Sequence, residues 1–423
     1  MKISTSRHDL LELMGKLKAA LPKKGHYLSL NVLRTVLLRT EKGRLVATAN
    51  NGDFCLTGSC KAKVTSGGSI CVAAEPLTAF LKAVASETVA LSSSNKLEKW
   101  TEREAYWDEN RNVQYRDVEK SRKLLSVRLE AGSAATKIEG YDQVYEAKDF
   151  PPVPRVKGKP VLVTLAPALE AVDYAVATEA TRPVLCGISF RQVKGKVELA
   201  ASDGFRLAVT CVKTRGTLTK EMVVDAQALS VVKHLMPKVV TITQAVKKGV
   251  DADGKAVTTV EAVSFEAAGM VLVARPIQST YPNYPQLIPA TKTGVTVARE
   301  AALEALKVIA GIKPEGGRVC LQTKGKNLIF WAKGDAGRTE VKVPARGKAQ
   351  IAFNLPYLRD IIQKVDSKVT LRTKSPSEPG VVKQNGTTHV LMPMFVQWDD
   401  KPKAKTSVSP DTRQAAKRKG EPN

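Results

Sequence analysis

The sequence runs through the same order of helix-like and strand-like segments three times, and this internal repeat limits the possible folds more than any other feature. Each copy opens with apolar residues spaced three and four apart, which is the spacing of one face of an amphipathic helix. The opening segments are RHDLLELMGKLKAALP (7–22), LAPALEAVDYAVATEA (165–180) and VAREAALEALKVIAG (297–311). We therefore predict three helices, each with one buried face.

Each of these helices is followed by two strand-like runs with a glycine in the turn between them, which is the pattern of a β-hairpin. The predicted hairpins are TVLLRTEKGRLVATA (35–49), GISFRQVKGKVELAA (187–201) and RVCLQTKGKNLIFWA (318–332). A second short helix comes next in every copy, at AEPLTAFLKAVAS (74–86), DAQALSVVKHLMP (225–237) and NLPYLRDIIQKV (354–365). Further strands follow, and the copies close on the proline-marked segments DFPPVP (149–154), TYPNYPQLIP (280–289) and HVLMPMF (389–395).

The matching order and the matching closing segments favour true repeats over coincidence, so we predict three α+β domains of one kind. The predicted divisions are 1–155, 156–290 and 291–396, followed by a basic tail at 397–423 that we expect to be disordered. The length of 423 residues agrees with this division, because chains of this length normally fold into several domains, each with its own hydrophobic core.

Two segments depart from the repeat. The segment VKKGVDADGKAV (246–257) has the composition of an extended hairpin tip. The segment KLEKWTEREAYWDENRNVQYRDVEKSRK (96–123) is a highly charged insert between strands of the first domain. Its aromatic residues Trp100, Tyr106 and Trp107 have two possible roles, as an anchor for a partner or as a contact with the body of the domain. We expect them to hold the insert against its own domain.

The net charge of +25 bears on the partners of the chain. A polyanion is the natural partner of such a chain, and nucleic acid is the first candidate, although a generally basic proteome gives the same charge. From Gln397 onward there are seven Lys or Arg and four Asp or Glu, so that the remaining +22 belongs to the folded body. No run approaches the ~20 apolar residues of a membrane span, and the N-terminus does not resemble a signal peptide. We expect a cytoplasmic protein.

The motifs of common catalytic sites are absent from the sequence. There is no G-K-[ST], no H-E-x-x-H and no G-x-S-x-G, and no pair of acidic residues typical of a two-metal site. The four histidines are scattered, and the six cysteines form no C-x-x-C pair. We therefore expect a scaffold with no catalytic centre, no metal and no cofactor.

A turn in the second repeat carries apolar residues where a polar tip is expected. In ELAASDGFRLAVTC (198–211), Asp-Gly between two apolar runs predicts a hairpin turn, yet a Phe, an Arg and a Leu follow it directly. Together with TRPVLCGISF (181–190), YPNYPQLIP (281–289) and VLMPMF (390–395), this turn resembles the bacterial DNA polymerase III β subunit family, the sliding clamps. The resemblance covers about residues 1 to 396, with the motifs in the same order.

The resemblance implies a ring made of two subunits joined head to tail. Helices would face a central hole and antiparallel sheets would lie outside. Such a homodimer would encircle double-stranded DNA through sequence-independent, salt-sensitive contacts with phosphates. It would be a processivity factor without chemistry of its own, a non-catalytic subunit of a DNA polymerase III holoenzyme, associated with the nucleoid.

The resemblance also implies a cleft between the second and third domains. There the replicative polymerase, the clamp loader and repair polymerases would dock short apolar peptides. The residues that correspond to its wall are Leu185, Ser202, Gly204, Phe205, Arg206, Leu207, Pro282, Leu287, Asn354, Tyr357, Val390, Met392, Pro393 and Met394. An apolar slot that contains methionine and a few polar groups suits this task. From spacing alone, VLMPM fits equally well an ordinary edge strand that ends in a core.

For contacts with DNA we predict Lys23, Lys24, Lys82, Arg182, Lys233 and Arg359. The alternative for each is a side chain that merely faces solvent. The chain departs from the family in four ways: Phe205 stands where His is usual, Gln286 stands where a basic residue is common, a tail follows the last motif, and the net charge is positive. Two other functions stay open, a basic architectural protein that does not close a ring and a nuclease with an unrecognised site.

Overall fold

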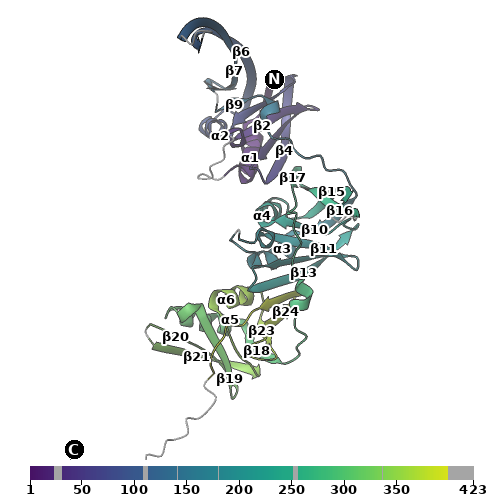
Figure 1. The fold of residues 1–423 in the computed structure, drawn as a ribbon, viewed down its shortest axis with the longest axis vertical. Coiled ribbons are helices and arrows are strands. Elements are labelled where there is room, and N and C mark those ends of the chain that lie inside the picture. The colour runs from purple at the N-terminus through teal and green to yellow at the C-terminus, as the bar shows by residue number, and fades with distance from the viewer. Residues whose placement is uncertain are drawn as a thin grey trace, which may run out of the picture.

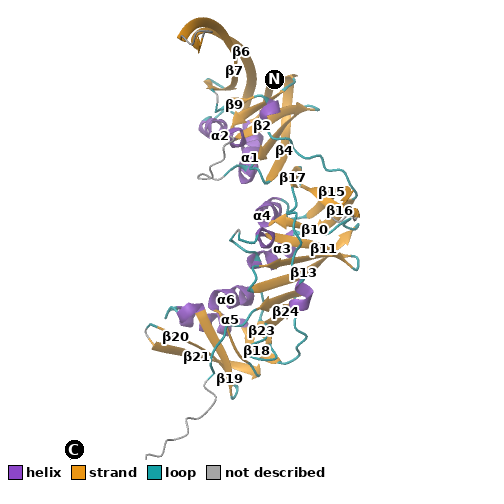
Figure 2. Cartoon of the chain, viewed as in Figure 1, coloured by secondary structure: helices purple, strands orange, loops and turns teal. Residues whose placement is uncertain are grey.

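The computed structural model describes residues 1–22, 31–107, 113–140, 142–179, 181–250, 256–335 and 337–398. These residues form three lobes arranged in an arc, with the N-terminus in the lobe at one end (Figure 1). The helices lie toward the concave side of the arc, and strands make up the rest of each lobe (Figure 2). No helix among the described residues is both long enough and apolar enough to span a bilayer.

Each lobe repeats one order of elements: a strand, a helix, four strands, a second helix and three strands. The first lobe contains β1 (Lys2–Ser6), α1 (Arg7–Leu17), β2 (Thr35–Glu41), β3 (Arg44–Asn50), β4 (Phe54–Ser66), β5 (Ser69–Ala73), α2 (Ala74–Ala83), β6 (Thr88–Trp107), β7 (Val113–Ala131), β8 (Ala134–Glu139) and an additional short β9 (Val144–Tyr145). The second contains β10 (Pro160–Thr164), α3 (Ala166–Val172), β11 (Gly187–Val193), β12 (Lys196–Ser202), β13 (Arg206–Arg215), β14 (Met222–Asp225), α4 (Ala226–Leu235), β15 (Val239–Val250), β16 (Ala256–Ala267) and β17 (Met270–Ala274). The third contains β18 (Gly294–Ala298), α5 (Arg299–Ala310), β19 (Arg318–Lys324), β20 (Asn327–Gly334), β21 (Gly337–Gly347), β22 (Gln350–Asn354), α6 (Leu355–Gln363), β23 (Lys368–Arg372), β24 (Gly380–Gln384) and β25 (Thr387–Leu391).

The six predicted helices and the three predicted hairpins are therefore confirmed. The helix predicted at 165–180 is shorter than expected: α3 ends at Val172, a short 3-10 helix follows at Asp173–Ala175, and the backbone amide of Ala177 donates to the carbonyl of Leu185 outside the helix. The stretches 151–159 and 288–293 contain no helix or strand. The boundaries near residues 155 and 290 stay predictions, and residues 399–423 of the predicted tail lie outside the described residues.

The helices are held by burial of one face and by their caps. In α1 the buried side chains are Leu10, Leu13, Met14 and Leu17, which follow the three- and four-residue spacing of the sequence. The hydroxyl of Ser6 accepts a hydrogen bond from the amide of Asp9 and caps the first turn. Burying apolar side chains of this size is the main favourable term in folding.

The lobes are joined by strand pairing. In the first junction β4 pairs antiparallel with β17, from Gly58 opposite Met270 to Phe54 opposite Ala274. In the second, β13 pairs antiparallel with β25, from Arg206 opposite Leu391 onward. In both junctions the fourth strand of one lobe therefore pairs with the eighth strand of the next. Gly58 permits the first approach, because a Cβ on it would lie 2.5 Å from the sulfur of Met270.

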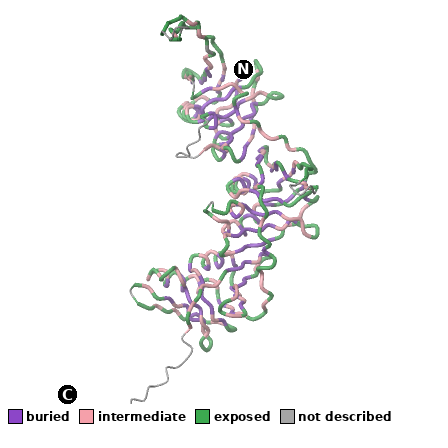
Figure 3. Tube along the Cα trace, viewed as in Figure 1, coloured by how far each residue is buried: buried purple, intermediate pink, exposed green. Residues whose placement is uncertain are grey.

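The charged insert at 96–123, which we call the ribbon, forms the outer part of a long hairpin of β6 and β7. Its far end has exposed and half-buried residues along the trace (Figure 3). Trp107 is 73% exposed, and Trp100 and Tyr106 are also exposed. The prediction that these aromatic residues hold the insert against its domain is wrong, because a ribbon of two strands leaves both of its faces in solvent.

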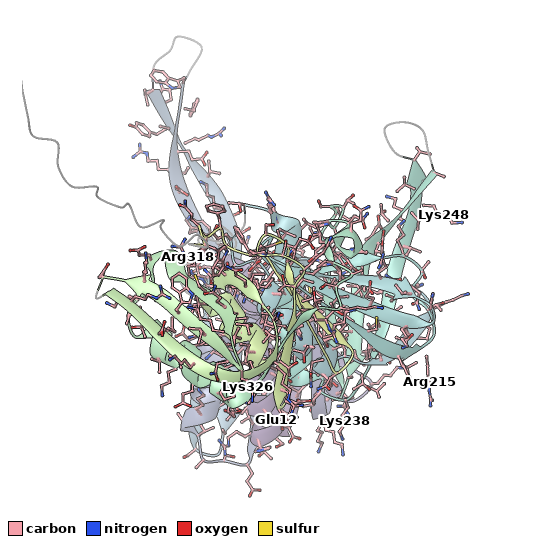
Figure 4. All side chains as sticks on the ribbon, turned by 90° about the horizontal axis from the view of Figure 1, so that it is seen from below. Glu12, Arg215, Lys238, Lys248, Arg318 and Lys326 are labelled. Atoms are coloured by element: carbon pink, nitrogen blue, oxygen red, sulfur yellow. The ribbon has the colours of Figure 1, made fainter. Side chains whose placement is uncertain are left out.

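A second hairpin, of β15 and β16, also projects from the body. Its strands extend through Val250 and from Ala256, so the described part of the predicted tip at 246–257 is strand, while 251–255 lie outside the described residues. The two hairpins rise on the same side of the molecule (Figure 4). Glu12, Lys238 and Lys326 lie toward the opposite side.

Candidate binding site at the junction of the second and third lobes

The turn between β12 and β13 is built by side-chain hydrogen bonds to its own backbone. The carboxylate of Asp203 accepts from the amides of Phe205 and Arg206, at 2.9 Å each. The hydroxyl of Ser202 donates to the carbonyl of Arg206 at 2.8 Å and accepts from the amide of Gly204. Gly204 has a φ of +93°, which side chains other than glycine rarely adopt. The turn is thus fixed, and it presents Phe205 to solvent.

Arg206 connects this turn to the third lobe. Its Nε lies 2.9 Å from Asp203, and its Nη1 lies 2.6 Å from Asp360 on α6. Its guanidinium also lies over the rings of Tyr357, at 4.4 Å, and Tyr174, at 5.3 Å. The side chain is only 11% exposed. A planar cation that pairs with two carboxylates and stacks on two rings holds both lobes at a fixed distance.

A hydrogen bond between Tyr174 and His389 lies beside this arginine. The hydroxyl of Tyr174 is 2.7 Å from Nδ1 of His389, which lies on β25. Burial lowers the pKa of His389 to about 4, and the nearby Lys364 acts in the same direction. Burial also raises the pKa of Tyr174. The imidazole is therefore neutral at neutral pH, and the junction contains a neutral polar pair next to the charged one.

Apolar side chains are exposed along the outside of the junction. Phe205 is 62% exposed and stacks on the ring of Tyr357, with ring centroids 6.3 Å apart. The amide of Met392 donates to the carbonyl of Phe205 at 2.9 Å, and Met392 is 44% exposed. Leu287 and Phe395 are exposed as well. Apolar residues of this size in water favour a partner that covers them.

The structure brings several of the predicted cleft residues together. Ser202, Gly204, Phe205 and Arg206 form the turn, and Tyr357 and Met392 contact it as described. Asn354 caps α6 by accepting from the amide of Tyr357. These residues come from two lobes and meet because β13 and β25 pair.

Other predicted cleft residues lie beneath the surface or at its margin. Leu185, Leu207 and Val390 are buried, and Leu207 stands directly opposite Val390 in the sheet. The strand that contains Val390 pairs with β13 on one side and β24 on the other, so the alternative of an edge strand is wrong. Pro393 and Met394 are half-buried, and the amide of Met394 donates to the carbonyl of Ala352.

The linker residues of the predicted cleft are both exposed. Pro282 and Leu287 lie on either side of Tyr284, which is buried in a small apolar cluster with Leu207 and Val390. Pro282 also lines a hollow of about 610 Å³, together with Met222 and Val260.

Four residues of the junction were not predicted: Asp203, Asp360, Tyr174 and His389. Asp203 lies inside the quoted turn motif, and its position before glycine indicates an Asx-type turn. The other three come from helices and strands far apart in the sequence. No local pattern could have placed them around Arg206.

The predicted DNA-contacting residues fall into three groups. Lys23 and Lys24 lie outside the described residues. Lys82, Arg182 and Arg359 are exposed, and Arg182 Nη1 would lie 4.0 Å from a Cβ added to Gly204, beside the turn. Lys233 is engaged in an ion pair with Asp173, which also lies 3.9 Å from Lys364. Within the described residues no cluster of His, Cys, Asp or Glu is suited to hold a metal ion.

Comparison with known proteins agrees with the resemblance seen in the sequence. Residues 162–283 match the family model described as the DNA polymerase III beta subunit, central domain. The chain is 29% identical over 274 residues to the beta sliding clamp of Synechocystis, covering 59% of this chain and 69% of that protein. It is 24% identical over 417 residues to the beta sliding clamp of Synechococcus elongatus, covering 93% of this chain and 99% of that protein.

A solved structure has the same fold. The DNA polymerase sliding clamp from Bacillus subtilis superimposes with a TM-score of 0.76 at 16% identity, covering 94% of this chain and all of that chain. At this identity the likeness shows the fold alone. The fold of three repeated clamp-type domains is therefore confirmed.

Proposed function

We propose that this chain, a relative of the bacterial beta sliding clamps, is a DNA sliding clamp. It would encircle duplex DNA and tether the replicative DNA polymerase and other replication and repair proteins, without chemistry of its own. We expect two subunits in the ring and association with the nucleoid.

Two strand edges carry this proposal. Within the described residues β8 pairs only with β7, and the 337–344 stretch of β21 pairs only with β20. β8 is the eighth strand of the first lobe, and β21 is the fourth strand of the third lobe. Both junctions inside the chain pair a fourth strand with an eighth strand. The remaining fourth and eighth strands, at the two ends of the arc, are thus complementary between copies.

This complementarity supports a head-to-tail assembly. Unpaired strand edges readily accept another strand. A heterologous contact of this kind generates a closed ring when the rotation closes, and otherwise an open filament. The arc formed by the three lobes supports closure by two copies (Figure 1).

The exposed apolar surface around Phe205 and Met392 supports a site for short apolar peptides. It joins two rings, a thioether and the guanidinium of Arg206, a combination that fits an apolar peptide and fixes its orientation. We propose this surface as the cleft for the polymerase, the clamp loader and repair polymerases.

The strongly positive chain supports contact with the phosphates of duplex DNA. Of the predicted contacts that the structure describes, Lys82, Arg182 and Arg359 are exposed and available. Lys233 is less free to bind DNA, because its ion pair with Asp173 must break before it can contact a phosphate. We expect binding that is independent of sequence and depends on salt.

The test is topological. The chain is loaded by the clamp loader of the same genome onto nicked circular DNA, washed in high salt, and the circle is then cut. A clamp stays bound through the wash and leaves only after the cut, while the same DNA linearised beforehand retains none. Loss in high salt before the cut would instead assign the chain to the alternative class, basic architectural proteins that do not close a ring.

A further inference from the structure

The described part of the ribbon ends in an exposed apolar surface on one face. Trp107 stands opposite Val113 in the pairing of β6 and β7, and Tyr115 lies two residues along the same strand from Val113. Because cross-strand partners and alternate residues share one face, the three side chains are neighbours. Trp107 is 73% exposed, Tyr115 is 59% exposed and Val113 is also exposed. We call these three residues the apolar tip.

The two strands of the ribbon are linked by ion pairs between their own side chains. Lys120 lies 2.8 Å from both Glu102 and Glu104, and Glu104 also lies 3.6 Å from Arg116. On the face of the apolar tip, Lys99 pairs with Glu119. The guanidinium of Arg103 lies 5.1 Å from the ring centre of Tyr115. A pre-ordered stem of this kind lowers the entropy that a partner must remove on binding.

Charge decides which class of partner the apolar tip fits. The ribbon contains eight Lys or Arg and seven Asp or Glu, although the whole chain has a net charge of +25. Lys99, Lys120 and Arg116 are engaged with carboxylates of the ribbon itself. A nucleic-acid site needs cations that are free to neutralise phosphates. The near-neutral ribbon is therefore poorly suited to a polyanion.

The composition of the tip is that of a protein interface. Tryptophan, tyrosine and arginine are the residues that dominate binding energy between proteins, and Trp107, Tyr115 and Arg103 lie together here. The ribbon also rises on the side of the molecule where Arg318 lies (Figure 4). Arg318 donates to the carbonyl of the exposed Phe395, close to the end of the candidate cleft. The ribbon and the third lobe lie at opposite ends of the arc (Figure 1), so a protein seated on the cleft from that side contacts the ribbon only if it spans the length of the chain.

We propose that the apolar tip is a second docking surface for the DNA polymerase that occupies the cleft. It would insert Trp107 and Tyr115 into an apolar pocket of that polymerase, with an acidic group facing Arg103. The inference rests on the proposed function, since it takes the polymerase as the occupant of the cleft.

The experiment compares a whole protein with a peptide. The double variant Trp107→Ser, Tyr115→Ser is tested for binding to the replicative polymerase of the same genome and, separately, to a synthetic peptide of the polymerase's own clamp-binding motif. We expect the affinity for the polymerase to fall at least about tenfold and the affinity for the peptide to stay unchanged. Val250→Ser, which changes an exposed apolar residue on the other hairpin, is the matched control and should leave both affinities unchanged.

Three results would overturn the inference. Unchanged affinity for the polymerase would show that the tip is not a docking surface for it. A loss of retention on DNA with unchanged polymerase binding would assign the tip to nucleic acid. A loss of the dimer in sedimentation would assign it to the second subunit. Failure of the unaltered chain to bind the peptide would instead contradict the proposed function, so the two failures are distinguishable.

Discussion

Nη1 of Arg206 lies 2.6 Å from Oδ2 of Asp360, so that an ion pair joins the turn after β12 in the second lobe to helix α6 in the third. The same arginine binds Asp203 within its own turn. Since its side chain is nearly buried, neither carboxylate can be replaced by water without cost. This contact adds to the pairing of β13 with β25 in joining the two lobes beside the candidate cleft.

Removal of the Asp360 carboxylate should weaken the junction. Asp360→Ala is expected to lower the free energy of unfolding by about 1–2 kcal/mol, because Arg206 stays nearly buried with one carboxylate instead of two. Chemical denaturation measures this. The control is Glu378→Ala, which removes an exposed partner of Lys374 and should cost less than about 1 kcal/mol. Equal effects of the two variants would show that the Arg206 contact contributes no more than a surface pair.

The methionines after β25 should contribute to peptide binding and little to stability. Met392→Ala combined with Met394→Ala is expected to weaken the binding of an apolar clamp-binding peptide about tenfold, because the variant loses flexible apolar surface. Fluorescence anisotropy with a labelled peptide measures the affinity, and circular dichroism checks the fold. Val308→Ala, at an exposed apolar position on α5, is the matched control. Unchanged affinity in the double variant would count against the cleft assignment.

The stability of the chain should fall in mild acid because of His389. Its folded-state pKa of about 4 lies below the ordinary value of 6.5, so between these values the unfolded chain binds a proton that the folded chain does not. Stability is therefore retained above about pH 6.5 and lost as the pH falls toward 4, with a total loss of about 3 kcal/mol from this group.

His389→Gln isolates this contribution from that of the carboxylates. The difference in unfolding free energy between the unaltered chain and the variant, measured from pH 7 to pH 4, should shrink as the pH falls. A difference that does not change with pH would show that the imidazole is not held neutral in the junction.

Two truncations separate the tail from the third lobe. The rings of Trp398 and Trp331 meet edge to face, with centroids 6.3 Å apart. Ending the chain after Val396 should leave the dimer intact in native mass spectrometry and lower the free energy of unfolding by about 1 kcal/mol, the value of such an aromatic pair. Ending it after Trp398 should retain that stability. A monomer from either truncation would show that the tail takes part in the assembly.

Local patterns predicted much of this fold. The opening helices followed from apolar spacing, as Leu10, Leu13 and Leu17 show, and the hairpins followed from glycine between two strand-like runs. The turn at Asp203 was also visible, because Asp-Gly between apolar runs is a local signal. These features depend on residues that are neighbours in sequence, so each can be predicted from a short segment alone.

The strand pairing between lobes could not be predicted from such local patterns. Nothing in the residues of β13 indicates that it pairs with β25, whose sequence lies far downstream. The surroundings of Arg206 depend on the same pairing, since they bring Asp360 and Tyr174 together from two lobes. The length of the β6–β7 hairpin was not predicted for another reason. Its many charged residues of both signs indicated an irregular insert, although cross-strand ion pairs such as Lys120 with Glu102 also stabilise a two-stranded ribbon in solvent.

The pairing of β13 with β25 also determines when, during synthesis of the chain, the junction of the second and third lobes can form. β25 ends at Leu391, so a ribosome must synthesise the chain as far as this strand before the edge of β13 is covered. Until then the second lobe has an open strand edge, Tyr174 lacks His389, and Phe205 lacks the Met392 amide. A prematurely terminated product therefore contains most of the fold but no finished docking surface. The proposed docking surface is thus completed only after β25 has been synthesised.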